Sequence, residues 1–524
     1  MILNNLEQKT EIIAAYKFAE NNSWISKIHG FQKEMYFQKI KLYYKFFSAY
    51  IFSTSHDNVE YSISQFLKLN LLNNELNKKI LLALHNKKVI SHPLPLEYIL
   101  ILRSKNIKIS RVNSTIKYIL YVYKSFISGI FNNLLLLKNI LFGNKPKLSI
   151  NKSIFFTDLQ ENCIPFENDN NIYNIINWFI SNNTTDEIVE IRHNIKSKKE
   201  FIKDGIQIKS EINPADYIQT IEAKLNFLFW TVNAILYNIF CLITFRLHSV
   251  LLYNESCYAK IYDLINIQYL PKEIYFSISS FQFKPLWTFV AEDKNIKVIN
   301  YSYASSFQGF KTKNGYVDQE YLFDNTRWKH IYYWSKDYYN YVLSRVPENV
   351  SVNLVNPIYY SDSNYILDKL STKYIGIFDV TPLEDYISCT FIPEIRYRNF
   401  KNSVLFLNDI YEAAVSNNFV LLWKRKRSFN SIHSKEYIEF CLEFEKRKNI
   451  IVIDPNASAF KIIKMCKICI SMPFTSTALI ARSFNINSIY YDPSGELYLD
   501  DRGAQGIKLI NDKNDLNNYF KSEF

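Results

Sequence analysis

Three consecutive residues with hydroxyl groups, Thr475, Ser476 and Thr477, stand between a short apolar run and a segment typical of a helix. The apolar run "KICI" begins at Lys467 and the helical segment covers 478–484, so the hydroxyls fall at the start of the expected helix. Hydroxyl oxygens and backbone N–H groups gather at such a position, and the helix dipole favours an anion there. Two interpretations remain open: a phosphate-binding turn, or ordinary capping of the helix, for which one hydroxyl is sufficient.

A run of four basic residues follows another apolar strand. The sequence "FVLLWKRKR" places Lys424, Arg425, Lys426 and Arg427 directly after that strand. Arginine can hold a phosphate with two parallel hydrogen bonds, and lysine supplies a compact positive charge. Such a run is also typical of a solvated surface, but its position after an apolar strand favours a phosphate site. The chain has no glycine-rich phosphate loop or dinucleotide fingerprint, which argues against ATP hydrolysis and nicotinamide chemistry.

Carboxylates and a further hydroxyl follow other strands. Asp379 ends "YIGIFD", and Asp492 and Ser494 follow "NSIYY". In parallel α/β sheets ligands bind outside the carboxyl ends of the strands, so these groups are expected at the edge that carries the hydroxyl turn and the basic run. Two more carboxylates, Asp318 and Asp324, occur earlier, in "YVDQEYLFD".

Alternating strands and helices are expected to position these groups. From residue 374 onward, short apolar runs alternate with helical segments, which is the pattern of a parallel sheet with crossover helices. A similar series, containing "SIFFTD", "EIVEIRHN", "EIYFSIS" and "KVINYSY", precedes it. The proline-containing segment 352–364 is expected to link the two series. We therefore predict an α/β protein with two doubly wound domains, preceded by a helical region.

The same patterns give domain boundaries. Residues 1–147 show helical periodicity and end at the polar, proline-containing "NKPKLS". Residues 148–356 form the first α/β domain, interrupted by a helical insertion at 218–266. Residues 357–524 form the C-terminal α/β domain, which carries the hydroxyl turn and the basic run.

Composition limits the class of protein and of partner. With 524 residues, of which 48% are hydrophobic and 21% charged, the chain is globular and long enough for several domains. A net charge of +12 favours anionic partners, and without a nucleic-acid motif we do not expect DNA or RNA among them. The seven irregularly spaced cysteines do not form a disulfide framework, and "CKIC", Cys466 and Cys469, is read as core.

Two long apolar segments raise the question of a membrane. The N-terminus lacks the basic start and apolar run of a signal peptide, which predicts a cytoplasmic location. The segment 225–245 is long enough to span a bilayer but contains Asn and Thr residues, and a second segment from Ser114 mixes lysines with a wide apolar surface. Both segments are either buried helices or helices that lie on an anionic membrane surface, and a span by 225–245 also remains open.

The motifs together resemble a known family. "SMPFTSTALIA", "NSIYYDPSG", "GIFDVTP" and "LLWKRKR" look like the bacterial polysaccharide-biosynthesis family named for its PFTS motif. The resemblance covers most of 284–501, where "KPLWTFVAEDKNIKVINYSYASS" and "YYWSKDYYNYV" also contribute, and leaves the helical N-terminus aside. This family is more distantly similar to the CMP-sugar-dependent transferases of capsule and lipopolysaccharide assembly, including Kdo and sialic-type transferases. Those have the GT-B arrangement, in which two α/β domains face each other.

The resemblance implies a glycosyltransferase of surface polysaccharide, capsule or lipopolysaccharide O-chain. The expected donor is a CMP-linked ulosonic acid, bound by the C-terminal domain. The expected acceptor is a glycan or a lipid-linked glycan, bound by the first domain and possible also on the helical region. The enzyme would be peripheral on the inner face of the cytoplasmic membrane. We see no convincing Asp-x-Asp motif, so neither a metal nor another cofactor is expected.

Roles can then be assigned to the residues already named. The groups expected to bind the nucleotide phosphate are Lys424, Lys426, Arg427, Thr475, Ser476 and Thr477. Asp379 is the expected catalytic base, with Asp318 and Asp324 as alternatives, and Asp492 and Ser494 are expected at the ribose or base.

The chain departs from the distant relatives at two places. "WKRKRS" replaces a Lys-Pro-His-Pro type motif, and Ser302, Ser305 and Ser306 stand where an acidic pair is common. The alternative function is a non-catalytic, membrane-associated polysaccharide assembly protein that keeps a degenerate nucleotide-binding fold.

Overall fold

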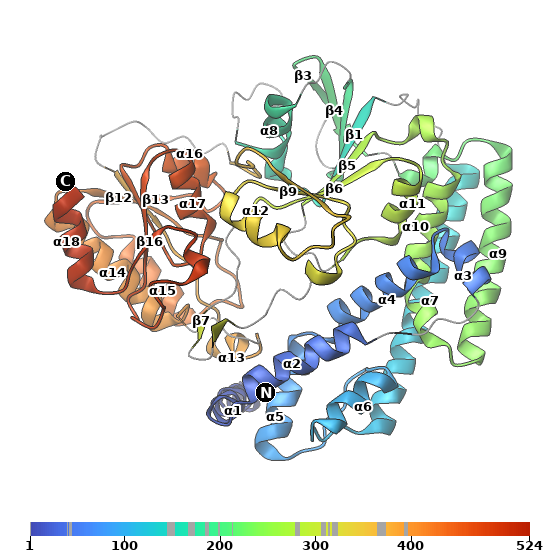
Figure 1. Cartoon of the computed structure of the whole chain (residues 1–524), viewed down its shortest axis with the longest axis horizontal. Coiled ribbons are helices and arrows are strands. Elements are labelled where there is room, and N and C mark those ends of the chain that lie inside the picture. Colours follow the sequence, from blue (N-terminus) through green and yellow to red (C-terminus); the bar gives the residue numbers. More distant parts are fainter. Residues whose placement is uncertain are drawn as a thin grey trace.

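A computed structural model describes residues 2–38, 40, 45–143, 152–165, 173–183, 188–196, 200–211, 213–277, 283–304, 311–312, 315–316, 323–363, 374–391 and 397–523. Its mixed α/β architecture has two parallel-sheet domains and a large helical body. Figure 1 shows the C-terminal domain in orange and red at the left and the first α/β domain at the top. The N-terminal helices, in blue, lie below and to the right.

The first sheet holds eight strands among the described residues and is parallel except at one edge, where β3 runs antiparallel to β4. In spatial order the strands are β10 (Ser351–Leu354), β9 (His330–Tyr333), β6 (Lys297–Tyr301), β5 (Glu273–Phe276), β1 (Ser153–Thr157), β2 (Glu190–His193), β4 (Ile206–Ser210) and β3 (Phe201–Lys203). Helices of this domain are α8 (Ile175–Asn182), α11 (Leu286–Asp293) and α12 (Lys336–Leu343).

Both faces of this sheet are covered, which is typical of parallel sheets. Along β1, Phe155 packs into the core shared with the helical body, whereas Ile154 and Phe156 pack into the core shared with the C-terminal domain. Along β5, Ile274 and Tyr275 divide in the same way. Because successive side chains of a strand point to opposite faces, both faces must be apolar, as the continuous apolar runs of the sequence indicated.

The second sheet is parallel throughout its described strands. Its spatial order is β13 (Ile450–Ile453), β12 (Val420–Lys424), β11 (Tyr374–Phe378), β14 (Ile468–Ser471), β15 (Asn487–Tyr491) and β16 (Lys508–Ile510). Its helices are α13 (Asp385–Ser388), α14 (Phe400–Ser416), α15 (Lys435–Phe444), α16 (Ala459–Ile463), α17 (Ser476–Ser483) and α18 (Lys513–Glu523). Cys466 and Cys469 are buried in its core.

The helical body combines the N-terminal region with helices from the middle of the chain, and one core contains residues of both. The N-terminal helices are α1 (Ile2–Asn21), α2 (Trp24–Phe37), α3 (Lys45–Phe52), α4 (His56–Leu71), α5 (Asn74–Asn86), α6 (Leu96–Ser104) and α7 (Arg111–Phe142). The later ones are α9 (Ile221–Ile243), the short 3₁₀ helix η3 (Leu247–Leu252) and α10 (Tyr253–Leu264). By length and composition α7 and α9 could cross a membrane, although both have one face packed against the helical body.

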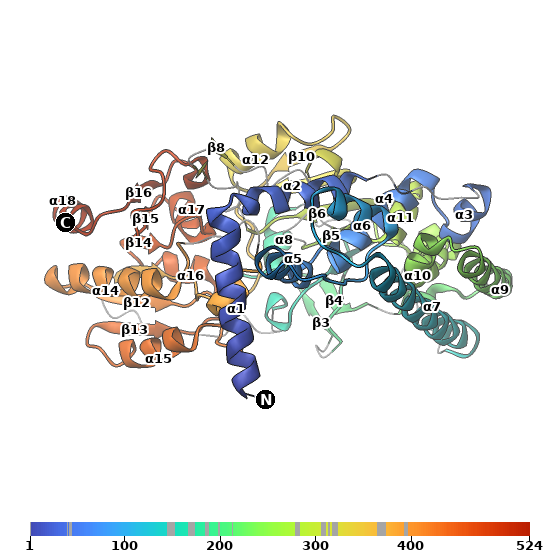
Figure 2. The same cartoon turned by 90° about the horizontal axis from the view of Figure 1, so that it is seen from below.

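The helical body also contacts the C-terminal domain. Figure 2 shows α1 crossing the middle of the molecule beside that domain. Lys9 Nζ of α1 lies 3.8 Å from Oε2 of Glu384, which precedes α13. Asn77 Nδ2 of α5 donates to the carbonyl of Thr390 at 2.9 Å. Because α13 follows β11, these contacts bring the N-terminal helices to the carboxyl edge of the second sheet.

Several elements differ from the sequence-based expectation. The beginning of the expected linker, 352–364, belongs to β10, a short edge strand paired with β9. The strands β3, β4, β9 and β16 were not predicted; they are only three to five residues long and mix polar with apolar residues. Helix α14 begins at Phe400, because Asn399 caps it by accepting from the N–H of Asn402.

Candidate functional site

The second sheet has a topological switch point between β11 and β14. From β11 the chain continues to β12 and β13 on one side, and later returns to β14 on the other side. The loops after β11 and β14 therefore lead away from each other, and in sheets of this kind ligands bind outside the carboxyl ends of the strands at such a point. Asp379 begins the first loop, 473–477 form the second, and Lys424 ends the neighbouring strand β12.

The hydroxyl turn lies at the start of α17, but its first residue does not cap that helix with its side chain. Thr475 Oγ1 donates instead to the carbonyl of Met472 at 2.8 Å, and it lies 3.2 Å from Thr477 Oγ1. Thr477 Oγ1 is also 2.7 Å from Ser471 Oγ at the end of β14. Ordinary side-chain capping by Thr475 therefore does not explain this run of hydroxyls, and the first turn of α17 keeps the positive dipole end that favours an anion.

The PFTS loop is held in a strained conformation. Phe474 is buried and has a φ of 56°, in the left-handed region that bulky residues rarely adopt. The hydroxyl of Tyr397 donates to the carbonyl of Pro473 at 2.7 Å, and Arg398 Nη2 donates to the carbonyls of Pro473 and Phe474 at 3.2 Å each. Strained residues persist where their surroundings fix them, and they cluster at functional sites. These contacts give the hydroxyl turn a fixed position beside Arg398.

Lys424 is buried at the end of β12. Its Nζ donates to the carbonyl of Pro455, after β13, at 2.9 Å. Desolvation lowers the pKa of Lys424 to about 8, and the charges of Asp379, Asp454 and Asp362 oppose that shift. Lys424 is thus a partly charged ammonium near neutral pH, fixed between two loops of the carboxyl edge.

Lys426 and Arg427 extend the positive charge toward the first domain. Lys426 is exposed to solvent, yet desolvation by the surrounding protein, together with the charges of Arg398 and Arg427, lowers its pKa to about 7. Burial raises the pKa of Tyr303, which follows β6, and the charge of Arg427 opposes that shift. The charge of Arg427 therefore acts on a residue that lies just beyond the end of β6 in the first sheet.

Asp379 lies behind these cations and is 2% exposed. Its Oδ2 accepts a hydrogen bond of 2.6 Å from the hydroxyl of Tyr437 on α15. Burial raises the pKa of Asp379, whereas Tyr437, Trp423 and Arg425 act in the opposite direction. The structure brings Asp379 to Lys424, as the strand pattern predicted, and its role as a base stays a prediction.

Asp492 and Ser494 form a tight turn after β15. Asp492 is fully buried; its Oδ1 accepts from the N–H of Ser494 at 3.0 Å and its Oδ2 from the N–H of Leu497 at 3.0 Å. The side chain of Asp492 therefore shapes its own loop. The contact of these two residues with a ribose or base stays a prediction.

The two carboxylates predicted in the first domain are not part of this cluster as described. Asp318 lies outside the described residues. Asp324 is exposed, and its Oδ1 is 3.5 Å from Nε of Arg345, which follows α12.

A carboxylate that was not predicted lies at the carboxyl edge of the first sheet. Asp158 directly follows β1, at the switch point between β1 and β5, and has a left-handed backbone with a φ of 55°. Its carbonyl accepts from Ser277 Oγ at 3.1 Å and from the hydroxyl of Tyr360 at 3.0 Å. Asp158 is exposed; desolvation raises its pKa, and a hydrogen bond of 3.2 Å from Thr157 Oγ1 to its Oδ2 acts in the opposite direction. The ring of Tyr360 stacks on that of Tyr303 at 4.0 Å, so Asp158 and the neighbourhood of Arg427 are connected.

The sequence contained a signal for Asp158. "SIFFTD" was recognised as a strand, and the rule that directed attention to the last residues of the C-terminal strands applies equally to its final Asp. Arg398 had no such signal, because it follows a stretch without a strand or helix pattern.

Over the described part of the chain, no group of three or more His, Cys, Asp or Glu side chains is placed to hold a metal ion. The described groups that can offset charge on a bound phosphate are Lys424, Lys426, Arg427 and Arg398.

Comparison with known proteins gives one family and a distant structural match. The UDP-GlcNAc 2-epimerase of Methanocaldococcus jannaschii, solved in complex with UDP-GlcNAc and UDP, is 10% identical to this chain; the match covers 71% of this chain and 92% of the epimerase, with a TM-score of 0.32. No curated protein matches the sequence. The family of polysaccharide biosynthesis PFTS motif proteins matches residues 230–520, more than half of the chain, including the hydroxyl turn and the basic run. The resemblance inferred from the motifs is thereby confirmed: the chain belongs to the family of polysaccharide biosynthesis PFTS motif proteins.

Proposed function

We propose that the protein is a glycosyltransferase of bacterial surface polysaccharide biosynthesis, with a GT-B-like arrangement of its two α/β domains. The observation that carries the proposal is the cation cluster of Lys424, Lys426 and Arg427, which follows β12, the neighbour of the switch-point strand β11. Arg398, which bonds to the loop before α17, acts on Lys426, and Arg427 acts on Tyr303 of the other domain. Membership of a polysaccharide biosynthesis family supports a sugar nucleotide as the anion that binds there.

The proposed donor is a CMP-linked ulosonic acid. Such a sugar carries a carboxylate next to the carbon that is attacked. The donor therefore presents two anionic groups, the carboxylate of the sugar and the phosphate of the leaving nucleotide. Arg398, whose charge lowers the pKa of Lys426, adds a fourth cation to the cluster and suits a ligand with two negative groups.

Transfer requires a base and stabilisation of the leaving nucleotide. The base removes the proton of an acceptor hydroxyl, the oxygen forms a bond to the anomeric carbon, and the bond from that carbon to the phosphate oxygen breaks. Lys424, Lys426 and Arg427, with the hydroxyl turn, would offset the charge that develops on the phosphate, and neither metal nor cofactor is proposed.

Two carboxylates are candidates for the base. Asp379 was predicted from the sequence, and Asp158 belongs to the domain on the proposed acceptor side. Asp158 is the better placed of the two because it is exposed, whereas Asp379 is buried and bonded to Tyr437. Desolvation raises the pKa of Asp158, and a higher pKa makes a carboxylate a stronger base.

The proposed location is the inner face of the cytoplasmic membrane, where a lipid-linked acceptor would be available. Helix α7 exposes an apolar stripe along its length, and only 22% of its most apolar 18-residue window is buried. The helix contains four basic and no acidic residues: Arg111, Lys117, Lys124 and Lys138. An exposed apolar face with positive charge suits an anionic membrane surface.

Thermal unfolding with millimolar CMP, UDP, GDP and ADP tests the proposal. A nucleotide present at about 100 times its Kd stabilises the fold by about 2.7 kcal/mol, and the shift should be lost in Lys426→Ala. Lys448→Ala is the matched control, because Lys448 is exposed and precedes β13 at the opposite edge of the sheet. A shift with CMP alone supports the proposed donor, and a shift with UDP or GDP keeps the transferase but replaces the donor.

A non-catalytic assembly protein gives a different result. No nucleotide would stabilise the fold, and polysaccharide production in cells would be unaffected by Lys424→Ala and Lys426→Ala. A transferase would lose turnover in these variants while its circular dichroism spectrum stayed unchanged.

A further inference from the structure

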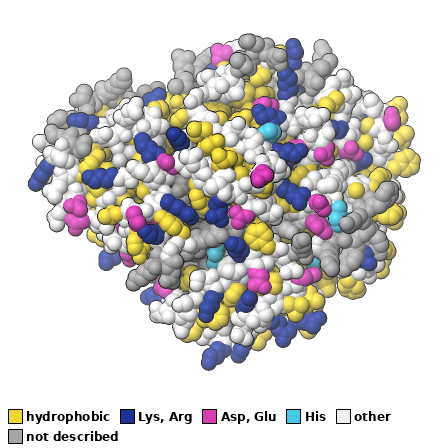
Figure 3. Space-filling view, viewed as in Figure 1, with side chains coloured by type: hydrophobic (Ala, Val, Ile, Leu, Met, Phe, Trp, Pro, Cys, Tyr) yellow, Lys and Arg dark blue, Asp and Glu magenta, His cyan; other side chains and the backbone are white. Residues whose placement is uncertain are grey.

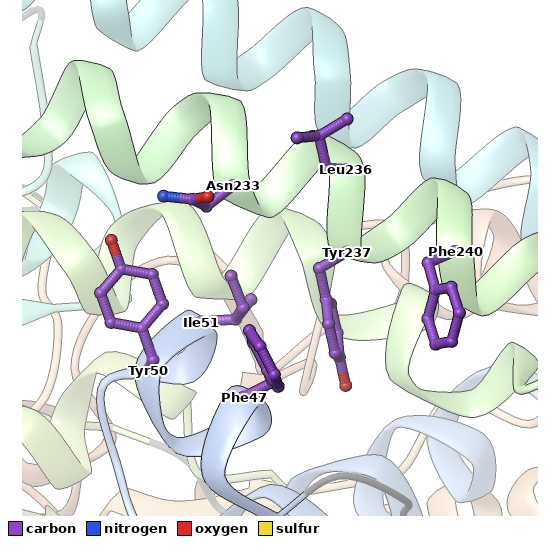
Figure 4. Close-up of a pocket in the computed structure, with 7 residues that line it drawn as sticks. All are labelled: Phe47, Tyr50, Ile51, Asn233, Leu236, Tyr237 and Phe240. Carbon is purple, nitrogen blue, oxygen red and sulfur yellow. The ribbon is translucent and has the colours of Figure 1, made fainter.

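A cavity of about 600 Å³ lies between α3 and α9 in the helical body. Its lining is apolar or aromatic apart from the amide of Asn233: Phe47, Tyr50 and Ile51 come from α3, and Leu236, Tyr237 and Phe240 from α9. Figure 4 shows the rings of Phe47 and Tyr237 side by side between the two helices. The size is within the range of pockets that hold small molecules, about 300–1,000 Å³.

The cavity is continuous with an exposed apolar stripe on α9. The outward residues of that helix recur at intervals of three or four and are 38–77% exposed: Ile221, Leu225, Phe229, Val232, Leu236, Ile239, Phe240 and Ile243. Leu236 and Phe240 belong both to the stripe and to the cavity wall. Figure 3 shows hydrophobic side chains gathered at the right-hand edge of the molecule, where α9 runs. The cavity therefore adjoins the surface with which α9 would meet a bilayer.

The inward face of α9 explains why this stripe is an outer surface. Thr231 Oγ1 donates to Asn133 Oδ1 of α7 at 3.0 Å, and Trp230 Nε1 donates to the carbonyl of Ile51 at 3.1 Å. These bonds fix which side of α9 faces the protein. They also join α9 to both α7 and α3, the helices that lie beside it.

The chemistry of the cavity selects a hydrocarbon chain. Its wall offers few polar groups, so a nucleotide, a sugar or a peptide backbone would lose hydrogen bonds to water without replacing them. Among the described residues, the Lys260 ammonium lies 5.7 Å from the centre of the Tyr50 ring and donates to Asp263 Oδ2 at 2.7 Å. An alkyl or isoprenoid chain with an anionic head would bury its chain in the cavity and keep its head in solvent.

We propose that this cavity binds the hydrocarbon chain of a phosphate-headed membrane lipid. The proposal deepens the proposed function, because the lipid-linked acceptor of a glycosyltransferase has this chemistry, and an ordinary phospholipid has it too. The chain would enter from the bilayer on which α7 and α9 lie. It would hold the lipid on the helical body, which reaches the carboxyl edge of the second sheet through α1 and α5.

Binding of three probes to the full-length protein tests the proposal: farnesyl phosphate, dodecyl phosphate and inorganic phosphate, each below the concentration at which it aggregates. We expect both chain-bearing probes to bind and inorganic phosphate not to bind. Phe47→Gln should weaken the binding of the chain at least about tenfold, because one buried apolar side chain contributes about 1.5–3 kcal/mol. Much tighter binding of farnesyl phosphate identifies an isoprenoid-linked acceptor, whereas equal binding identifies a general membrane lipid.

Phe229→Gln is the matched control, because Phe229 and Phe47 are 63% and 59% exposed but only Phe47 lines the cavity. If Phe47→Gln and Phe229→Gln bind farnesyl phosphate and dodecyl phosphate with equal affinity, the proposal is wrong. It is also wrong if inorganic phosphate binds as tightly as the two chain-bearing probes. Phe240→Gln provides a second test if Phe47→Gln unfolds. Nucleotide-induced stabilisation, measured in the same proteins, reports on the proposed function separately. If no nucleotide stabilises the unmodified protein, the transferase proposal is contradicted, but the lipid site is not.

Discussion

The hydroxyl of Tyr437 donates a 2.6 Å hydrogen bond to Asp379 Oδ2, and the charge of the same carboxylate raises the pKa of Lys424 against the desolvation that lowers it to about 8. We expect Asp379→Asn to lower the pKa of Lys424 further, because the opposing negative charge is gone. Nucleotide binding, measured by calorimetry, should then weaken most at about pH 8 and least at about pH 6. Tyr437→Phe keeps the carboxylate and should retain the pH profile; an equal change in both variants would show that the hydrogen bond, not the charge, matters.

Nucleotide affinity should fall as the pH rises. Desolvation lowers the pKa of Lys424 to about 8 and that of Lys426 to about 7, and each lysine is positively charged only below its pKa. Each therefore loses its attraction for phosphate between about pH 6 and pH 9, at a cost of about 1.5–3 kcal/mol per charged hydrogen bond. Calorimetry across this range should show the decline. Lys426→Arg should remove its lower step because arginine stays charged, and Lys448→Arg at the opposite edge should leave the profile unchanged; a flat profile in the native protein would contradict the prediction.

The strand ends that carry the site could be predicted because their information is local. In a parallel sheet every carboxyl end lies at the same edge, so the apolar runs before Asp379, Lys424 and the hydroxyl turn were enough to bring these groups together. The turn after β15 shows the limit of this reasoning. Asp492 also stands at a strand end, but its oxygens bond to the N–H groups of its own turn, as Asp often does in the sequence Asp-Pro-Ser-Gly.

What the sequence could not provide was contact between distant segments. Arg398 reaches Pro473 across 75 residues, and the charge of Arg427 acts on Tyr303 of the other domain. Neither pairing has a periodic signal, because the first depends on how two loops of the C-terminal domain pack and the second on how the two domains pack. The same holds for α9, whose apolar outer stripe and apolar inner face have similar composition and are separated only by packing against α7 and α10.

Asp158→Asn and Asp379→Asn should separate the two candidate bases. If Asp158 is the base, Asp158→Asn should lower kcat by about 10²–10⁴-fold while nucleotide binding is retained, because general base catalysis contributes about that factor. Asp379→Asn should instead weaken nucleotide binding through Lys424. Sugar transfer and nucleotide binding, measured on both variants, give the comparison. A loss of kcat in Asp379→Asn with unchanged binding would return the role to Asp379.

The buried ion pair between Lys284 and Glu292 of α11 should contribute strongly to the free energy of unfolding of the first domain. Lys284 Nζ lies 2.6 Å from Glu292 Oε1, and both side chains are almost fully buried. Glu292→Gln should destabilise the fold by about 3–5 kcal/mol, because it removes the negative charge beside the buried Lys284 ammonium, which also donates to the carbonyl of Arg327. Glu443→Gln, in the exposed pair with Lys446, should cost less than about 1 kcal/mol. Denaturant unfolding measures both, and similar losses in the two variants would contradict the argument.

Substitution of Phe474 tests how the left-handed backbone of the PFTS loop contributes to stability and to nucleotide binding. Both Phe474→Ala and Phe474→Gly lose the buried ring, at a cost of about 3–5 kcal/mol. The φ of 56° costs a residue with a Cβ about 1–2 kcal/mol, so the glycine variant should be the more stable of the two.

Phe444, buried at the end of α15, is the matched control, because its backbone is helical. At this position the alanine variant should be more stable against unfolding than the glycine variant, by about 1 kcal/mol. Melting temperatures of the four variants test this reversal of order. The same order at both positions would mean that the loop is not left-handed at Phe474. If the reversal holds, both Phe474 variants should also bind nucleotide more weakly than the Phe444 variants, because the hydroxyl turn that directly follows Phe474 would lose its fixed position at the start of α17.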